Sequence, residues 1–284
     1  MADQYVEIEI ISDGELRENL IGNLSQLGIE GFWEDGSSLR CYVSGTRWIP
    51  GMLDEVKAVI GRMTRSSSSV APRISVRTLD NRNWNEEWEK TIRPIQVTDS
   101  IVVTPTWHTH DPSPGQIVLT IDPKMSFGTG YHESTRLALR LLERYVKPGM
   151  HVLDIGTGTG VLAIAAIKLG AMHVTAVDSD EWSYRNALEN MQRNEVATQV
   201  HLIQGEISSV PIQKFDIITA NIQLNVLVSL VADMTIYLSR GGNVLLSGLL
   251  RPDRDPMIHA LNVAGFTIME ELSENEWIAL AGSC

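Results

Sequence analysis

A glycine-rich turn between an apolar strand and an apolar helix is the part of this chain best suited to chemistry. The segment His151–Gly160 reads H-V-L-D-I-G-T-G-T-G and precedes the helical stretch Val161–Leu169. Free backbone N–H groups at the start of such a helix can bind a ligand, and glycines let that ligand approach the main chain. The turn therefore predicts a nucleotide-binding βα unit, rather than a purely structural one.

Two carboxylates near this turn indicate which ligand it binds. Asp154 precedes the glycines, and Asp178 ends the next expected strand, where a carboxylate can accept both hydroxyls of a ribose. A dinucleotide fingerprint needs a glycine at position 161, but that residue is Val161, and the third glycine is Gly160. The spacing D-x-G-x-G-x-G, followed by an acidic residue one strand later, is typical of enzymes that use S-adenosylmethionine (SAM).

The elements around the turn alternate between helix and strand. After a helix at Ser134–Tyr145, the expected strands are His151–Ile155, His173–Val177, Val200–Gln204, Phe215–Ala220, Asn243–Gly248, Phe266–Leu272 and Glu276–Ala281. The turn between the last two is too short for a parallel crossover, so this pair must be antiparallel. The pattern predicts an α/β fold with the seven-stranded, mostly parallel, doubly wound sheet of Class I SAM-dependent methyltransferases. Ligands bind there at the carboxyl ends of the strands, where Gly156, Asp178 and Asn221 fall.

Residues 1–82 are expected to form a separate small α+β domain. Its expected strands are Tyr5–Ile11, Phe32–Glu34, Leu39–Val43 and Arg73–Leu79, with helices at Glu15–Leu27 and Pro50–Met63. The order strand, helix, two strands, helix, strand is that of the ferredoxin-like fold. Because this stretch has no catalytic constellation, we expect a binding module, with an inert stabilising domain as the alternative.

A linker helix at residues 83–94 is expected to join this domain to a catalytic domain at residues 95–284. Trp84 and Trp88 are four residues apart and share a helix face, which suits packing onto one domain or a hinge.

The segments that follow the linker, Ile95–Pro105 and Gln116–Ile121, are expected to form a β-hairpin. His108 and His110 lie in the intervening loop with no third ligand nearby, so we expect solvated residues and no metal site.

The composition narrows the class of protein. The chain has 284 residues, two cysteines and a net charge of −12. Cys41 and Cys284 are far apart, which excludes a disulfide framework or cysteine zinc site and fits a cytoplasmic protein. The first residues lack a signal-peptide core, and no apolar run is long enough to span a membrane. The acidic surface disfavours direct nucleic-acid binding and favours a basic protein partner.

A second signature precedes the first helix of the catalytic domain. Asp122–Thr135 reads D-P-K-M-S-F-G-T-G-Y-H-E-S-T, in which glycines around Phe127 permit a tight loop and Thr135 offers a hydroxyl at a helix start. The alternative is an ordinary helix-capping loop. After the fourth strand the chain reads A-N-I-Q-L-N, and Asn221 there is expected to project over the glycine turn.

These motifs together resemble the PrmA family, the methyltransferases of large-subunit ribosomal protein eleven. The resemblance rests on D-P-x-x-x-F-G-T-G-x-H, V-L-D-I-G-T-G-T-G-V-L-A-I-A-A, A-V-D-S-D, A-N-I and S-G-L-L, and on W-N-E-E-W-E-K in the linker. It implies a SAM-dependent N-methyltransferase whose N-terminal domain recognises the ribosomal protein. Lysine side chains and the N-terminal α-amine are the implied methyl acceptors.

Carried over position by position, the family's SAM contacts are implied for Thr135, Gly156, Asp178 and Asn221. Gly158 belongs to the same glycine turn. Phe127 and Gly128 lie in the loop that closes over the cofactor. The family's usual T-H-P-T-T is Y-H-E-S-T here, so Tyr131 and Glu133 depart from the pattern at the rim of the acceptor site.

The chemistry required is an in-line methyl transfer to a neutral amine, which needs alignment of donor and acceptor. We see no strong general base, and Asn221 is the candidate residue that orients the acceptor. His132 has either a direct chemical role or the role of ordering its loop. Other possibilities are an N-methyltransferase for another protein or a small molecule, an inactive SAM sensor, and a nicotinamide-dependent oxidoreductase, which Val161 disfavours.

Overall fold

The chain forms two compact units, Met1–Glu89 and Lys90–Cys284. The structure is a computed structural model that describes residues 5–11, 20, 24, 27, 29, 31–35, 38–44, 47–49, 51–64, 72–79, 93–122, 128 and 130–284. The predicted linker at residues 83–94, with Trp84 and Trp88, lies outside these residues except for Arg93 and Pro94. Each unit is described separately below.

The first unit contains a four-stranded antiparallel sheet and a helix. Its elements are β1 (Tyr5–Ile11), β2 (Gly31–Asp35), β3 (Ser38–Ser44), α2 (Met52–Thr64) and β4 (Arg73–Leu79). The strand order β2-β3-β1-β4 is that of the predicted ferredoxin-like fold. The helix predicted at Glu15–Leu27 lies largely outside the described residues, but Leu20 and Leu24 are helical and fully buried.

Alternation along β1 separates an apolar face from a charged face. Ile8 and Ile10 are fully buried in a cluster that includes Val56 of α2. Glu7 points to the opposite face, where its carboxylate accepts two hydrogen bonds from the Arg77 guanidinium, at 2.6 and 3.0 Å. This sheet therefore packs its core on one side and carries paired charges on the other.

The second unit is built around a seven-stranded sheet. Its elements are β5 (Ile95–Gln96), β6 (Ile101–Thr104), β7 (Ile117–Thr120), α4 (Glu133–Tyr145), β8 (His151–Ile155), α5 (Val161–Lys168), β9 (His173–Asp178), α6 (Glu181–Arg193), β10 (Val200–Gln204), the 3₁₀ helix η1 (Ile207–Ser209), β11 (Phe215–Asn221), α7 (Leu224–Tyr237), β12 (Leu238–Leu250), the 3₁₀ helix η2 (Arg251–Asp253), α8 (Arg254–Val263), β13 (Thr267–Glu274) and β14 (Trp277–Ser283). The order is β10-β9-β8-β11-β12-β14-β13. β14 alone runs opposite to the other six strands, which confirms the predicted Class I methyltransferase fold.

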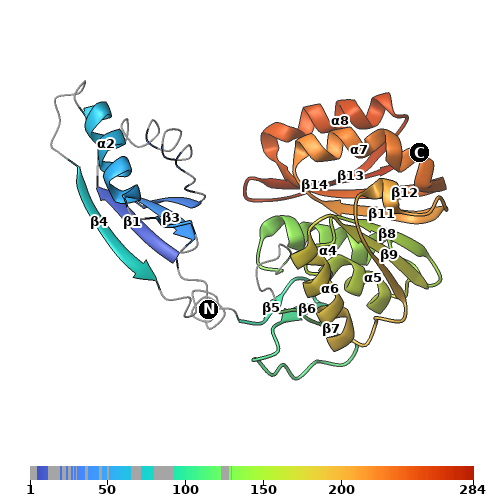
Figure 1. The fold of residues 1–284 in the computed structure, drawn as a ribbon. Helices are drawn as coiled ribbons and strands as arrows, with labels where there is room; N and C mark the ends of the chain where they lie inside the picture. The colour runs from blue at the N-terminus through green and yellow to red at the C-terminus, as the bar shows by residue number, and fades with distance from the viewer. Residues whose placement is uncertain are drawn as a thin grey trace. The chain divides into compact units, whose positions relative to one another are not determined.

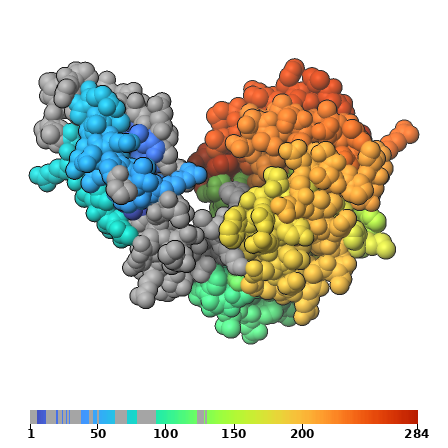
Figure 2. Space-filling model, in the orientation of Figure 1, coloured from blue at the N-terminus to red at the C-terminus, as the bar shows by residue number. Residues whose placement is uncertain are grey.

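Helices cover both faces of this sheet (Figure 1). Val152 of β8 belongs to the core shared with α4, α5 and α6, whereas the next residue, Leu153, belongs to the core shared with α7 and α8. Burial on both faces explains why the parallel strands read as continuous apolar runs. Residues from α6 to α8, coloured yellow to red-orange, form most of the visible face of this unit (Figure 2). Within the described part of the chain, every helix is too short or too polar to cross a membrane.

The hairpin predicted from Ile95–Pro105 and Gln116–Ile121 is wrong. The hairpin lies within the first segment, where β5 pairs antiparallel with β6, and β6 then pairs in parallel with β7. The prediction missed the turn between β5 and β6, in which Thr98 Oγ1 accepts the backbone N–H groups of Ser100 (3.3 Å) and Ile101 (3.0 Å). Residues 105–116 then carry the chain back, so that β7 runs in the same direction as β6.

A carboxylate is fully buried in the central strand β8, just before the glycine turn. Asp154 Oδ2 accepts a hydrogen bond from Thr157 Oγ1 at 2.6 Å, while Oδ1 has no partner within the described part of the chain. Burial, with a smaller contribution from the charge of Asp178, raises the pKa of Asp154 to about 7. Folding therefore favours the protonated acid.

This raised pKa predicts a specific dependence of stability on pH. Because the folded pKa exceeds the unfolded value, the contribution of Asp154 is complete below about pH 4 and is lost as the pH rises to about 7. We expect Asp154→Asn to remove this loss. The free energy of unfolding of the variant, relative to the wild type, should rise by about 2–3 kcal/mol between about pH 5 and about pH 8. Urea unfolding at both pH values measures it, and parallel pH dependences would contradict the assignment.

Candidate functional site

A cavity of about 750 Å³ opens at the carboxyl ends of β8, β9, β10 and β11. Its lining residues all come from the second unit: Ile155, Gly156, Gly158, Val177, Asp178, Ser179, Ser183, Gly205, Glu206, Ile207, Ser208, Asn221, Ile222, Gln223, Val226, Ser229, Leu230, Asp233, Gly248 and Trp277. A cavity of this size at this edge of a doubly wound sheet can hold a nucleoside-sized ligand. Four of the predicted site residues, Gly156, Gly158, Asp178 and Asn221, are brought together here.

The glycine turn requires its glycines. Gly156, Gly158 and Gly160 have φ values of 70°, 56° and 83°, in the left-handed region. A Cβ atom at Gly156 would lie 2.6 Å from Ile222 Cγ2, so the turn also needs the space that glycine leaves. The Gly156 N–H donates to the carbonyl of Val177 at 2.9 Å, which fixes the turn against the end of β9.

Asp178 organises both the turn and the start of α6. Its carboxylate accepts the N–H of Gly158 at Oδ2 (2.8 Å) and the N–H of Asp180 at Oδ1 (3.0 Å). A carboxylate has about four lone-pair sites, so each oxygen can still accept a hydroxyl from a ligand in the cavity. Asp180 caps α6 by accepting the N–H of Ser183 at 3.1 Å.

Asn221 presents an unused acceptor at the cavity. Its side chain is buried, and Nδ2 donates to Thr135 Oγ1 at 3.2 Å. Its Oδ1 atom is buried and has no hydrogen-bond partner in the part of the chain that the structure describes. A buried amide oxygen without a hydrogen-bond partner destabilises the folded protein. A ligand that donates an N–H or O–H to Oδ1 would remove this cost. Thr135 orients this amide without itself lining the cavity.

The charges around the cavity have one sign. Asp178, Glu206 and Asp233 line it, and its described lining contains no Lys, Arg or His. Such a lining attracts a cationic ligand and opposes a phosphate.

The loop between β7 and α4 is described only in part. Phe127 lies outside the described residues. Gly128 is buried without lining the cavity, and its carbonyl accepts Thr159 Oγ1 of the glycine turn at 2.7 Å. A Cβ atom at Gly128 would lie 2.8 Å from Thr159 Oγ1, so the close contact between this loop and the glycine turn also needs a glycine.

The residues that end this loop contact the terminal hairpin. His132 is the N-cap of α4, and its Nδ1 accepts the N–H of Ser134 at 3.3 Å. The His132 ring also packs edge-on against Trp277, with 4.4 Å between the ring centroids. Glu133 accepts the side-chain amide of Asn275 at 3.0 Å. Hydrogen bonds of Arg136 to the Tyr131 carbonyl and to Glu274 join the same two segments. Glu133, which departs from the family's usual loop, thus has its own polar partner.

The two loop histidines have polar partners from the protein. His108 Nε2 lies 2.9 Å from Arg93 Nη1, and His110 Nε2 lies 2.8 Å from Gln116 Oε1. No cluster of three or more His, Cys, Asp or Glu side chains that could hold a metal occurs among the described residues.

Sequence reasoning missed the far wall of the cavity. Residues of α7, the segment Gly205–Ser208 and Trp277 line it without belonging to a motif with recognisable spacing. Gly248, by contrast, lies in the S-G-L-L motif that contributes to the family resemblance. It has a φ of 83°, and a Cβ there would lie 2.6 Å from the carbonyl oxygen of Ile222.

Known proteins resemble this chain over nearly its full length. The family described as ribosomal protein L11 methyltransferase (PrmA) matches residues 4–283. The ribosomal protein L11 methyltransferase of Chlorobaculum tepidum is 37% identical over 279 residues, covering 97% of this chain and 95% of the relative. That of Listeria innocua is 32% identical over 278 residues, covering 97% and 88%.

Solved structures agree with the fold. The crystal structure of a ribosomal protein L11 methylase from Lactobacillus delbrueckii subsp. bulgaricus has a TM-score of 0.64 and 32% identity, and covers 68% of this chain and 98% of that one. A methyltransferase from Pyrococcus furiosus, at 23% identity and a TM-score of 0.50, covers 58% and 88% and shares the fold. By the extent and identity of these matches, the chain belongs to the PrmA family of ribosomal protein L11 methyltransferases.

Proposed function

We propose that this protein is a SAM-dependent N-methyltransferase that methylates amino groups of ribosomal protein L11, on lysine side chains and at the N-terminal α-amine. The observation that carries the proposal is the unpaired Asn221 Oδ1 beside the glycine turn and Asp178, in a chain of this family. The enzyme works in the cytoplasm, where ribosomal proteins are available to it.

The cavity suits SAM in shape and charge. The main chain at Gly156 and Gly158 allows close approach, and the free lone pairs of Asp178 accept the ribose hydroxyls. SAM supplies a methyl group on a positively charged sulfur. The acidic lining complements that charge, and it would repel the diphosphate of a nicotinamide dinucleotide. The preference for SAM over a dinucleotide agrees with the sequence, in which Val161 occupies the position where a dinucleotide fingerprint needs a glycine.

Asn221 is suited to hold the acceptor amine. Its Oδ1 accepts an N–H of the neutral amine, which directs the nitrogen lone pair toward the donor methyl group. The hydrogen bond from Nδ2 to Thr135 fixes the amide orientation. A free lysine ammonium has a pKa of about 10.4, and desolvation beside a second positive charge lowers that pKa. His132 acts as the helix cap that holds Thr135 in the first turn of α4.

The function is tested by incubating the purified chain with ribosomal protein L11 and isotopically labelled SAM, and locating the label by mass spectrometry. We expect label on amines of the ribosomal protein. Asn221→Ala should lower kcat/KM at least about tenfold, because it removes a hydrogen bond that strengthens as positive charge develops on the attacking nitrogen. Asn225→Ala, an exposed asparagine outside the lining, should stay within about twofold. Unlabelled ribosomal protein with the wild-type enzyme would refute the proposal.

The ribose contact gives a binding prediction. Asp178→Ala removes an acceptor for two hydroxyls, and each such hydrogen bond to a charged group contributes about 1.5–3 kcal/mol. We expect SAM affinity, measured by calorimetry, to fall at least about tenfold. Asp180→Ala is the matched control. It removes an exposed carboxylate two residues away, which caps α6 but does not line the cavity. Unchanged affinity in Asp178→Ala, or an equal loss in both variants, would exclude a ribose contact.

The division of labour between the units is part of the proposal. We propose that residues 1–82 recognise the ribosomal protein, that residues 83–94 act as a linker, and that residues 95–284 bind SAM and catalyse transfer. In support, all lining residues of the cavity come from the second unit, and the first has its own core. Tethered recognition raises the effective concentration of substrate amines.

A chain that begins at Asn83 should therefore still bind SAM but capture the ribosomal protein poorly. We expect KM for the intact ribosomal protein to rise at least about tenfold, since tethering is lost. A short lysine peptide should be turned over equally by both chains. Steady-state kinetics with the two substrates measures this. Equal activity of both chains on the intact protein would show that the first unit does not recognise it.

A further inference from the structure

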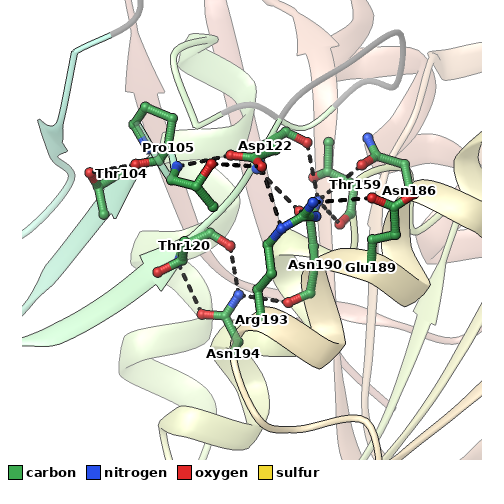
Figure 3. Close-up of polar contacts among 11 residues, drawn as sticks. Thr104, Pro105, Thr120, Asp122, Thr159, Asn186, Glu189, Asn190, Arg193 and Asn194 are labelled. Carbon is green, nitrogen blue, oxygen red and sulfur yellow. Dashed lines mark hydrogen bonds and ion pairs between the residues drawn. The ribbon is translucent and has the colours of Figure 1, made fainter. Parts of the chain in front are cut away.

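Two asparagines, Asn190 on α6 and Asn194 at the C-cap of that helix, hold the free edge of the chain at the end of β7 and just beyond it (Figure 3). Asn194 Oδ1 accepts the N–H of Thr120 at 2.9 Å, and its Nδ2 donates to the Thr120 carbonyl at 2.6 Å. Asn190 repeats the arrangement at Asp122, accepting its N–H at 3.1 Å and donating to its carbonyl at 3.3 Å. The backbone N–H and carbonyl groups of Thr120 and Asp122 are therefore paired with side-chain amides rather than with another strand.

Helix and strand geometry explain this match. Residues four apart on a helix rise by about 6 Å, and residues two apart on a strand are separated by about 6.6 Å. Thr120 ends β7 and Asp122 lies two residues further on, so both present their N–H and carbonyl groups on the same side of the chain. The opposite edge pairs with β6, where the Ile121 N–H donates to the Thr104 carbonyl at 2.9 Å. α6 thus takes the place of a neighbouring strand.

Asn190 also reaches the glycine turn, which Asn194 does not. Its Nδ2 also donates to the carbonyl of Thr159, in the glycine turn, at 2.9 Å. The Thr159 hydroxyl in turn donates to the carbonyl of Gly128 at 2.7 Å. One fully buried amide therefore joins Asp122, just beyond β7, to the glycine turn, and through Thr159 to Gly128.

The surroundings of Asn190 require an amide. Its oxygen accepts from a backbone N–H and from Arg193 Nη1 at 3.3 Å, while its nitrogen donates to two carbonyls. Arg193 also reaches the Asp122 carboxylate, with Nε 3.4 Å from Oδ2. An aspartate would bring a carboxylate against the two carbonyl oxygens, and an alanine would leave buried polar groups unpaired.

We propose that Asn190 is a positioning residue for the cofactor site, acting through the Thr159 carbonyl and the Asp122 peptide to hold the glycine turn in its ligand-binding conformation. The inference rests on the proposed function in that the ligand is SAM. Asn190 does not line the cavity, so its effect on binding is transmitted by the turn.

The test compares Asn190→Ala with Asn194→Ala, using the demethylated product S-adenosylhomocysteine as the calorimetric probe. Each variant loses the paired contacts to one residue, Asp122 or Thr120, so both should lower the thermal unfolding midpoint. Only Asn190→Ala should weaken probe binding, at least about tenfold, because only it frees the glycine turn. Hydrogen exchange at Gly158–Gly160 should accelerate in this variant alone. In kinetics, KM for SAM should rise more than kcat falls.

Asn190→Asp adds a readout that lost stability alone would not produce. A protonated aspartic acid can donate to Thr159 again, so its probe affinity, measured where the variant is folded, should recover as the pH falls. Equal loss of affinity in Asn190→Ala and Asn194→Ala, or wild-type affinity in Asn190→Ala, overturns the positioning role and leaves the proposed function intact. Failure of the wild-type chain to bind the probe overturns both.

Discussion

The site depends on how the glycine turn after β8 is bonded to the end of β9. In the turn, the N–H of Gly156 donates to the Val177 carbonyl and that of Gly158 to the Asp178 carboxylate. These bonds form only if the backbone takes the left-handed conformation that glycine allows. Parallel pairing then places β11 beside β8, so that Asn221 ends at the same edge as Asp178. Residues distant in sequence meet because strand ends coincide, and the chemistry of the cavity follows from that coincidence.

Sequence patterns predicted what is local in origin. Apolar runs between turn residues located β8, β9 and β10, and the spacing of glycines and carboxylates located the turn and Asp178. The hairpin failed because the turn around Thr98 depends on a side-chain hydroxyl rather than on glycine or proline. The α7 wall of the cavity could not be predicted, since Leu230 and Asp233 have no spacing that distinguishes lining residues from other helical ones. The role of Asn190 needed the register between helix and strand.

Polar side chains inside this unit replace backbone partners that the fold does not supply. Asn190 and Asn194 pair with a strand edge, and Ser247 Oγ donates to the carbonyl of Ser134 at 2.8 Å in the fully buried contact between β12 and α4. Such groups add little net free energy when paired, but leaving one unpaired is costly. They therefore select one arrangement of the loops around the cavity, whereas the apolar cores on both faces of the sheet supply most of its stability.

The position of β14 has a consequence for biosynthesis. This strand lies between β12 and β13 in the sheet, yet it follows both of them in the chain. It also carries Trp277, which lines the cavity and touches His132 at the start of α4. While the ribosome is still translating β13, β14 has not yet been made. β12 then lacks its neighbour in the sheet, and the cavity wall is incomplete. The sheet and the cavity wall of the second unit can therefore be completed only after β14 has left the translating ribosome.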